Sequence, residues 1–248
     1  MNGSAIGRRG ALALFFAASG LFAGFPAALA GDGDFHAAQA AAYAHYREAV
    51  FYTRSANIPV AGLALDEFIV KWTRLVEEYG ETPPAAYAAD ATWKETLQEI
   101  LRRAESGLAA LDMEDAAAAN DAINPIRGIL GDLRRRNNVV TYSDHVDALS
   151  AAMDVLARYR REVTDLDTAA TVAMVREQAA IVEALFKKCA TEAAPEVTGD
   201  PEFTRLIDGA TESMGKLLKS LETGDILLYR IGIGELRSYE RIMFLRFG

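Results

Sequence analysis

The stretch DLRRRNNVVTYSDH, residues 132–145, separates two long helical segments of the chain. Its arginines at 134–136 are typical of the last turn of a helix, where cations interact favourably with the carbonyl end of the helix dipole. Asn137 and Asn138 then break the helical pattern, and Ser143 stands where the N-cap of the next helix is expected. Because three adjacent arginines point in different directions around a helix, the stretch favours a joint between two units over an anion site.

On both sides of this joint, apolar residues recur at intervals of three and four, which is the spacing of one face of an α-helix. One such series is Leu65, Phe68, Trp72, Leu75 and Tyr79. No segment shows the sustained two-residue alternation of a surface strand. Caps and Pro or Gly breaks divide the chain into eight expected helices, near 36–55, 61–80, 91–111, 113–136, 143–161, 168–190, 201–222 and 225–246. The sequence therefore predicts an all-α protein, and eight helices suggest two bundles of four.

The two halves also share the spacing of their helix caps and aromatic residues. A shift of 110 positions without gaps superimposes residues of the same kind: Asp90 on Asp200, Trp93 on Phe203, Asp115 on Asp225, Arg127 on Arg237. Agreement of caps, aromatic residues and helix lengths at one offset indicates an internal repeat. We therefore expect two tandem up-down four-helix-bundle units that arose by internal duplication, with unit 1 at 31–137 and unit 2 at 138–248.

Residues 1–30 have the pattern of a secretory signal peptide. The basic pair Arg8 and Arg9 precedes an apolar run at 11–25, and a small-x-small cleavage pattern follows at 28–30. The run is too short and wrongly flanked for a stable membrane span. We therefore expect a cleaved signal rather than a retained anchor helix, no stable membrane insertion, and a periplasmic or secreted protein.

The composition limits the partners and the chemistry. Removal of the predicted signal takes away two arginines and no acidic residue, so the formal net charge falls from −9 to −11. An acidic surface disfavours nucleic acid as a partner. The single cysteine, Cys189, cannot form an intramolecular disulfide, and the lack of a C-x-x-C-H sequence excludes covalently attached haem of the c type.

Arg127 and Arg237 stand inside apolar helical stripes at equivalent positions of the two halves. An arginine at a helix interface needs a partner that offsets the loss of its hydration. Glu67 and Glu177 are related by the same offset of 110 positions. We therefore expect the ion pairs Arg127 with Glu67 and Arg237 with Glu177, one in each unit; the alternative is an anionic ligand held in each bundle.

His45 and Glu48 form an H-x-x-E motif. The two residues lie one helical turn apart, so both side chains can approach one metal ion. In this motif and in the expected pair of bundles, the chain resembles imelysin-like periplasmic proteins. The resemblance implies a metal site at His45 and Glu48, and the alternative is an ordinary solvated helix face.

His145 and Met243 suggest a second kind of site. The first and last helices of an up-down unit are antiparallel neighbours, so His145 near the start of unit 2 is expected near Met243 at its end. In export, helical class and this pairing, the chain resembles four-helix-bundle cytochromes of the b562 type. The resemblance implies haem b at this pair, with copper as another candidate. The alternative is a surface histidine and a core methionine.

The sequence contains none of the catalytic motifs we sought: no H-E-x-x-H, no phosphate-cradling glycine loop and no pair of E-x-x-H motifs. Gly232 and Gly234 are expected within the last helix, where they permit close packing or a kink. We therefore expect a non-enzymatic binding or interaction module in the periplasm, which holds a protein partner or a small ligand. The alternative is a haem- or metal-binding bundle for electron transfer or metal handling.

Overall fold

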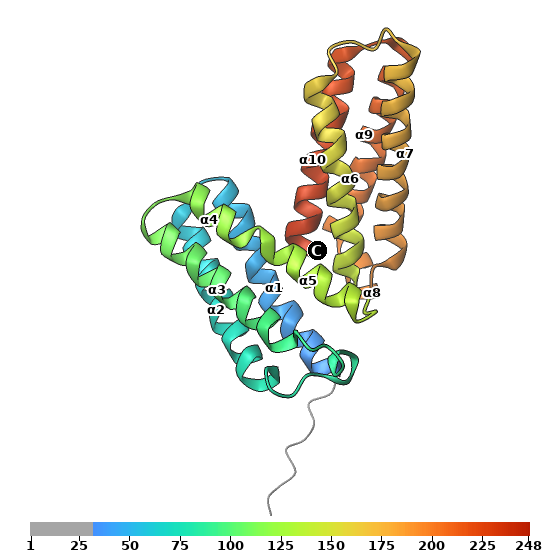
Figure 1. Cartoon of the computed structure of the whole chain (residues 1–248). Coiled ribbons are helices and arrows are strands. Elements are labelled where there is room, and N and C mark those ends of the chain that lie inside the picture. The colour runs from blue at the N-terminus through green and yellow to red at the C-terminus, as the bar shows by residue number, and fades with distance from the viewer. Residues whose placement is uncertain (1–31) are drawn as a thin grey trace, which may run out of the picture.

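The computed structural model describes residues 32–248, and all regular secondary structure in this range is helical (Figure 1). The signal peptide predicted at 1–30 lies outside the described residues. In chain order the helices are α1 (Asp32–Arg54), α2 (Ile58–Tyr79), the 3-10 turn η1 (Ala85–Tyr87), α3 (Trp93–Asp112), α4 (Ala116–Ile123), α5 (Pro125–Arg136), α6 (Tyr142–Glu162), α7 (Ala169–Glu192), α8 (Pro195–Thr198), α9 (Pro201–Thr223) and α10 (Ile226–Phe247).

The structure differs from the predicted helices in one long element and two short ones. The helix expected over 113–136 is broken, because Pro125 has no backbone N–H and its ring cannot continue an α-helix that has already begun. Two short turns, η1 and α8, fill stretches that were predicted as breaks; η1 follows Pro84, and Pro195 is the first residue of α8. The N-cap of α6 is Thr141 rather than Ser143.

The N-terminal helix group, α1 to α5, is built on apolar stripes. Helices α1 to α4 pack antiparallel to their neighbours in the chain, and α4 packs back against α1. The stripe predicted from Leu65 to Tyr79 is buried along α2. Two indole N–H groups join α2 to α3: Trp72 donates to the carbonyl of Leu97 at 2.9 Å, and Trp93 donates to the carbonyl of Tyr79 at 2.8 Å. Burial of these rings with satisfied N–H groups stabilises the group without a polar penalty.

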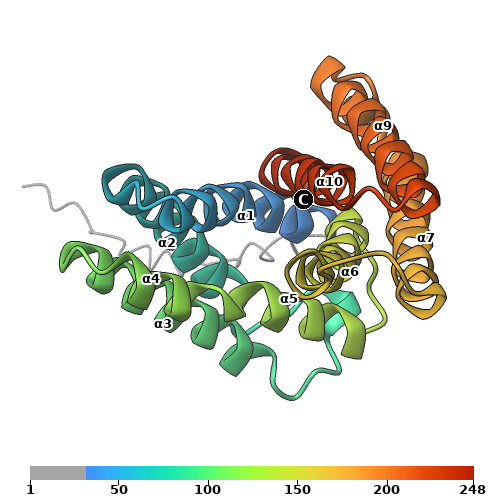
Figure 2. The ribbon, with the colours of Figure 1, turned by 90° about the horizontal axis from the view of Figure 1, so that it is seen from above.

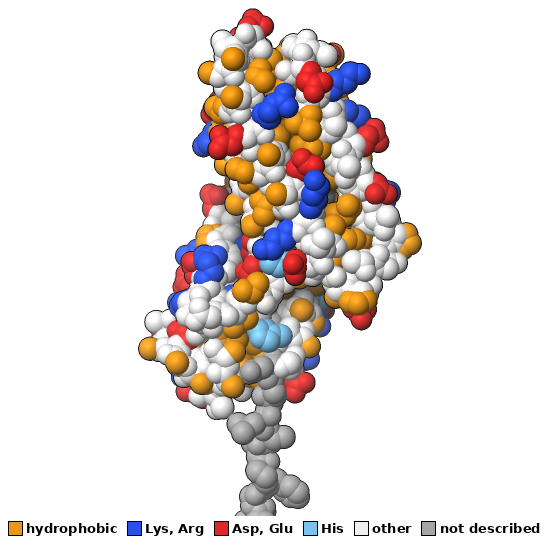
Figure 3. Space-filling model, turned by 90° about the vertical axis from the view of Figure 1, so that its right-hand side faces the viewer, with side chains coloured by type: hydrophobic (Ala, Val, Ile, Leu, Met, Phe, Trp, Pro, Cys, Tyr) orange, Lys and Arg blue, Asp and Glu red, His pale blue; other side chains and the backbone are white. Residues whose placement is uncertain are grey.

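The C-terminal helix group, α6 to α10, follows the same pattern of neighbours. In it α6 packs on α7, α7 on α9, α9 on α10, and α10 back on α6. An apolar groove lies between α7 and α9, and Figure 3 shows apolar side chains between the charged ones on this face. Gly232 lets α10 approach α9 closely, since a Cβ there would lie 3.0 Å from the backbone N of Leu217. Close packing at this glycine agrees with the sequence prediction.

The two helix groups meet along α1, α5, α6 and α10. Figure 2 shows α10 beside α1, and α5 extending from α4 toward α6. The end of α10 lies at this junction (Figure 1). None of the helices within 32–248 is sufficiently long and apolar to span a bilayer.

Replacing Gly232 by alanine tests the close α9–α10 approach. A Cβ at this position would also lie 3.1 Å from the carbonyl oxygen of Ser213, and backbone atoms of a packed helix yield only at a cost. We expect Gly232→Ala to lower the free energy of unfolding by about 1–2 kcal/mol. Urea denaturation followed by circular dichroism measures the change.

Gly215→Ala is the matched control, because Gly215 is an exposed residue inside α9 with nothing near its missing Cβ. It should raise stability by up to about 1 kcal/mol through helix propensity. Equal effects at the two glycines would contradict the close approach.

Candidate functional site

Arg127 connects the two helix groups. From α5 its Nε donates to the carboxylate of Asp147 on α6, and its Nη2 donates to Ser150 Oγ at 2.9 Å. Its guanidinium also lies 4.2 Å from the ring centre of Phe244 on α10. Burial alone would lower the pKa of Arg127, but the Asp147 carboxylate outweighs this effect and raises it. The predicted pair with Glu67 is wrong: Glu67 is exposed on α2, and the partner comes from the other helix group.

Arg237 likewise does not pair with Glu177, which is exposed on α7. Its guanidinium lies 2.6 Å from Asp154 on α6 and 3.1 Å from the buried carboxylate of Glu240 on its own helix. Ser150 also donates a hydrogen bond to Glu240. The predicted pairing failed because the nearest carboxylates are those of Glu240, one turn away on α10, and Asp154, on the neighbouring helix α6. Neither position follows from the repeat offset.

The three seam arginines make three different contacts. Arg134 is only 3 % exposed, and its Nε donates to both carboxylate oxygens of Asp144 at 2.8 and 3.0 Å. Arg135 has a side chain 68 % exposed, and it pairs with Asp132 on the same helix. Arg136 lies 2.7 Å from Asp90, which precedes α3. Arg134 therefore holds the end of α5 to the start of α6, as an ion pair of low exposure with nearly ideal geometry.

The carboxylate of Asp90 accepts several hydrogen bonds near the start of α3. Arg136 Nε and Asn137 Nδ2 both donate to Oδ2 at 2.7 Å, while the backbone N–H and the hydroxyl of Thr92 donate to Oδ1. Desolvation alone would raise the pKa of Asp90, but these hydrogen bonds outweigh it and lower the pKa from 3.8 to about 2. The seam is thereby joined to both neighbouring parts of the chain.

The two metal candidates have different surroundings. His45 Nδ1 lies 3.7 Å from Glu48 Oε2, and both side chains are partly exposed on α1. Within residues 32–248, no three His, Cys, Asp or Glu side chains come together as a metal-binding group. Met243 on α10 is fully buried in the hydrophobic core. His145 on α6 is half-buried, and its ring lies edge-on to the ring of Tyr142. Haem or copper at His145 and Met243 stays a prediction, as does a metal at His45 and Glu48.

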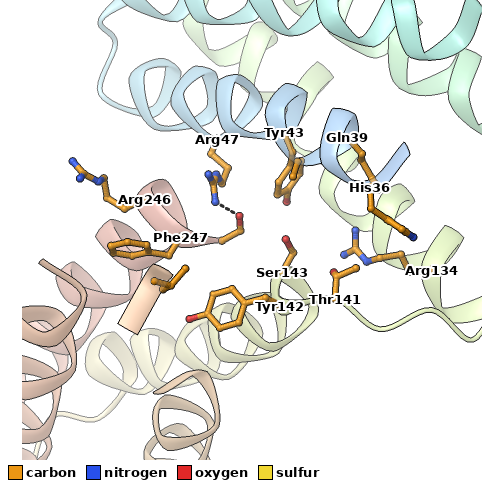
Figure 4. A pocket seen from close by; sticks show the side chains of 13 residues that line it. His36, Gln39, Tyr43, Arg47, Arg134, Thr141, Tyr142, Ser143, Arg246 and Phe247 are labelled. Atoms are coloured by element: carbon orange, nitrogen blue, oxygen red, sulfur yellow. Dashed lines mark hydrogen bonds between the residues drawn. The ribbon is translucent and has the colours of Figure 1, made fainter. Parts of the chain in front are cut away.

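A cavity of about 390 Å³ lies where the seam meets the start of α1 and the end of α10, and we call it the seam cavity (Figure 4). Both helix groups contribute to its wall. The lining residues are His36, Gln39, Ala40, Tyr43, Arg47, Arg134, Thr141, Tyr142, Ser143, Val197, Arg246, Phe247 and Gly248. Four of them, at 36, 39, 43 and 47, recur at intervals of three and four, so that they share one face of α1.

The charge of this lining is unusual for an acidic chain. It includes three arginines and a histidine, and none of the lining residues that the structure describes is acidic. Arg134 is paired with Asp144, and the exposed Arg246 lies 4.0 Å from Asp200. Arg47 is half-buried, and its Nη1 donates to an oxygen of Gly248.

Two tyrosine hydroxyls of the lining also lack partners within the described part of the chain. Tyr43 is 5 % exposed, and neither its hydroxyl nor that of Tyr142 makes a hydrogen bond. Burial raises the pKa of both hydroxyls, so each is a neutral donor at physiological pH. In Figure 4 the Tyr43 hydroxyl and the Ser143 side chain point toward each other from opposite sides of the cavity. Each of the two hydroxyls can donate to an acceptor that enters the cavity.

Comparison of the chain with models of protein families, with curated proteins and with solved structures finds no match. The seam cavity is therefore the strongest basis for a function. The sequence interpretation identified the arginine triplet but missed the polar face of α1. The spacing of His36, Gln39, Tyr43 and Arg47 is the signal that could have revealed this face.

Replacing Arg134 by methionine tests the ion pair that holds α5 to α6. Removal of this buried guanidinium leaves Asp144 without its main partner, so we expect a loss of about 3 kcal/mol in the free energy of unfolding. Arg135→Met is the matched control on the next residue, and it should change stability by less than about 0.5 kcal/mol. Urea titration of both variants measures the difference, and comparable losses would contradict the assigned role of Arg134.

The lowered pKa of Asp90 predicts a loss of stability in acid. A carboxyl whose folded pKa is depressed contributes stability above its unfolded pKa, and this contribution disappears as the pH falls from 3.8 toward 2. We expect Asp90→Asn to cost about 1–2 kcal/mol at pH 7 and to flatten the decline between pH 4 and 2. Thermal unfolding measured from pH 7 to pH 2 tests both effects, with Asp132→Asn at an exposed position as the control. An unchanged dependence of stability on pH in Asp90→Asn would refute the assignment.

Proposed function

We propose that this protein is a non-enzymatic binding module that takes a small ligand into the seam cavity. The observation that carries the proposal is the group of donors without a hydrogen-bond acceptor in its wall: the Nε of Arg47 and the hydroxyl of Tyr43 on α1, and the hydroxyl of Tyr142 at the seam. Cavities that bind small molecules combine apolar walls with a few convergent polar groups. Both helix groups contribute to the cavity wall, so a ligand that fills the cavity lies between them.

The architecture proposed for this module is a pair of up-down four-helix bundles related by duplication, over 31–137 and 138–248. The helix bounds support it, because α4 begins at Ala116 and α10 at Ile226, an offset of 110. The N-caps Asp115 and Asp225, at the same offset, each accept a hydrogen bond from a backbone N–H of the following helix. Placement in the periplasm rests on residues 1–30 and is part of the proposal.

Occlusion of the cavity tests the proposal. Ala40 lines the cavity and Ala41 is an exposed neighbour on the same helix outside it, so tryptophan at these two positions is a matched pair. We expect the protein purified from its host to release a stoichiometric small molecule on denaturation, detected by mass spectrometry. Ala41→Trp should retain it, and Ala40→Trp should lose it because the indole fills the space.

The same pair is then compared in a thermal-shift screen of small metabolites. A ligand at one hundred times its Kd stabilises the folded state by about 2.7 kcal/mol, which is readily visible. Hits shared by the wild type and Ala41→Trp but absent from Ala40→Trp would support the seam cavity. Hits that persist in Ala40→Trp, or a Soret band lost in His145→Ala, would favour another site or the haem alternative.

A further inference from the structure

A second cavity, of about 560 Å³, lies between α6 and α10, which pack side by side (Figure 1). We call it the arginine cavity, because its lining includes Arg160 and Arg161 on α6 and Arg237 and Arg241 on α10. Its positions 154, 157 and 161 on α6 and 234, 237 and 241 on α10 recur at intervals of three and four. One face of each helix therefore forms the cavity. It shares no lining residue with the seam cavity.

The lining of the arginine cavity is strongly basic. In the described part of the chain, four arginines and one aspartate, Asp154, give it a charge of +3, although the whole chain has a formal charge of −9. Arg237 contacts Asp154 and the buried Glu240. The other three arginines of the lining make no ion pair with any residue in the range 32–248. The cavity thus gathers cations whose charge the surrounding side chains do not balance.

Two of these arginines are held in place by the protein. Arg160 Nε donates to the backbone carbonyl of Arg230 on α10 at 2.8 Å, and the terminal nitrogens of its guanidinium donate to no group within 32–248. Gly234 makes room for this guanidinium, since a Cβ there would lie 3.6 Å from its Nη2. Arg237 Nη2 donates to Asp154 at 2.6 Å. Side chains that are already positioned lose less conformational entropy when they bind a ligand.

The positive charges are spread along the cavity and do not converge on one point. Arg160 contacts α10 beside Gly234, and Arg241 lies seven residues further along this helix. Seven residues of an α-helix span about 10 Å. An elongated ligand with several anionic groups can therefore contact more of these arginines than a single small anion can.

Positive charge also reaches the neighbouring end of α1. Partial loss of hydration lowers the pKa of Arg54, and the nearby charges of Arg237 and Arg241 lower it further. Like charges that are held close together repel each other, and a bound anion relieves this repulsion. The basic region thus favours a ligand that carries more than one negative charge.

We propose that the arginine cavity binds a short chain of phosphate groups, with its anionic oxygens on the four arginines of the lining. Guanidinium groups bind phosphate through paired N–H donors. A phosphate group carries up to about two negative charges at neutral pH, so a short chain brings several charges into a small volume. This chemistry is common to inorganic oligophosphates and nucleoside triphosphates. The site is distinct from the seam cavity and does not depend on the function proposed there.

Tripolyphosphate is the first probe, measured by isothermal titration calorimetry on the full chain. Arg161 and Arg241 are exposed and make no hydrogen bond or ion pair within 32–248, so their joint replacement by glutamine should leave the fold intact. We expect Arg161→Gln/Arg241→Gln to weaken binding about tenfold or more, because two of the four phosphate contacts are lost.

Arg74→Gln/Arg176→Gln is the matched control. It removes the same charge from two exposed positions, on α2 and α7, that also make no ion pair in the described part of the chain. Its affinity for tripolyphosphate should change by about twofold or less, because distant surface charges are screened by salt. Equal losses in the two double variants would overturn the site, and so would the absence of tripolyphosphate binding to the wild type.

Asp154→Asn should change the affinity in the opposite direction. It removes the only carboxylate that the structure describes in the lining and releases Arg237 Nη2 for the ligand. We expect tripolyphosphate to bind about threefold or more tightly, an effect that damage to the fold cannot produce. Asp208→Asn, at an exposed position on α9, makes the same change of charge and should alter the affinity by less than about twofold. Unchanged or weaker binding in Asp154→Asn would overturn the proposal.

Three further probes define the ligand class. Orthophosphate that binds as tightly as tripolyphosphate would show a site for a single anion and overturn the phosphate chain. Citrate of equal affinity would show selection by charge alone and overturn the assignment to phosphate. Tighter binding of ATP than of tripolyphosphate would support a nucleotide as the source of the phosphates, whereas equal or weaker binding of ATP would support an inorganic chain. The seam cavity is judged separately, by the loss of its ligand in Ala40→Trp.

Discussion

The ion pairs between α5 and α6 determine how the two halves of this protein are joined. Arg127 and Arg134 on α5 face Asp147 and Asp144 on α6, and Arg134 is almost completely enclosed. Desolvation alone would raise the pKa of Asp144, but Arg134 and the Thr141 donors keep it below its usual value, so the carboxylate stays charged at neutral pH. Such pairs discriminate strongly between right and wrong geometry, because a misplaced partner leaves a buried charge uncompensated.

A polar network continues from this joint into the C-terminal helix group. Ser150 accepts a hydrogen bond from Arg127 and donates one to Glu240, which in turn contacts Arg237. Polar networks of this kind specify one arrangement of packed helices when their members are satisfied. The apolar stripes stabilise each helix group, whereas this chain of polar contacts relates one group to the other.

The polar joint between α5 and α6 borders the seam cavity, because Arg134 belongs to both. The backbones of α5 and α6 approach each other at few positions, and the long side chains of Arg127 and Arg134 span the gap. The space left beside α1 contains Arg47 and Tyr43, whose free donors are the basis of the proposed binding function.

Local features of the sequence determined the helices. The three- and four-residue spacing of apolar residues, the acidic N-caps such as Asp115 and Asp225, and the proline breaks involve neighbours within one or two turns, and the helix bounds agree with them to within a few residues. The break at Pro125 was also visible in the sequence, although its effect was not predicted. Cys189 on α7 is fully buried.

Only the tertiary structure decided the partners of the charged residues and the place of the cavity. Arg127 pairs with Asp147 across the joint, and the repeat offset had pointed to Glu67, because sequence spacing reports which face of a helix a residue occupies but not which helix it meets. His36 and Gly248, at opposite ends of the described chain, line the same cavity. Their proximity depends on the packing of α10 beside α1, a long-range arrangement that no local pattern encodes.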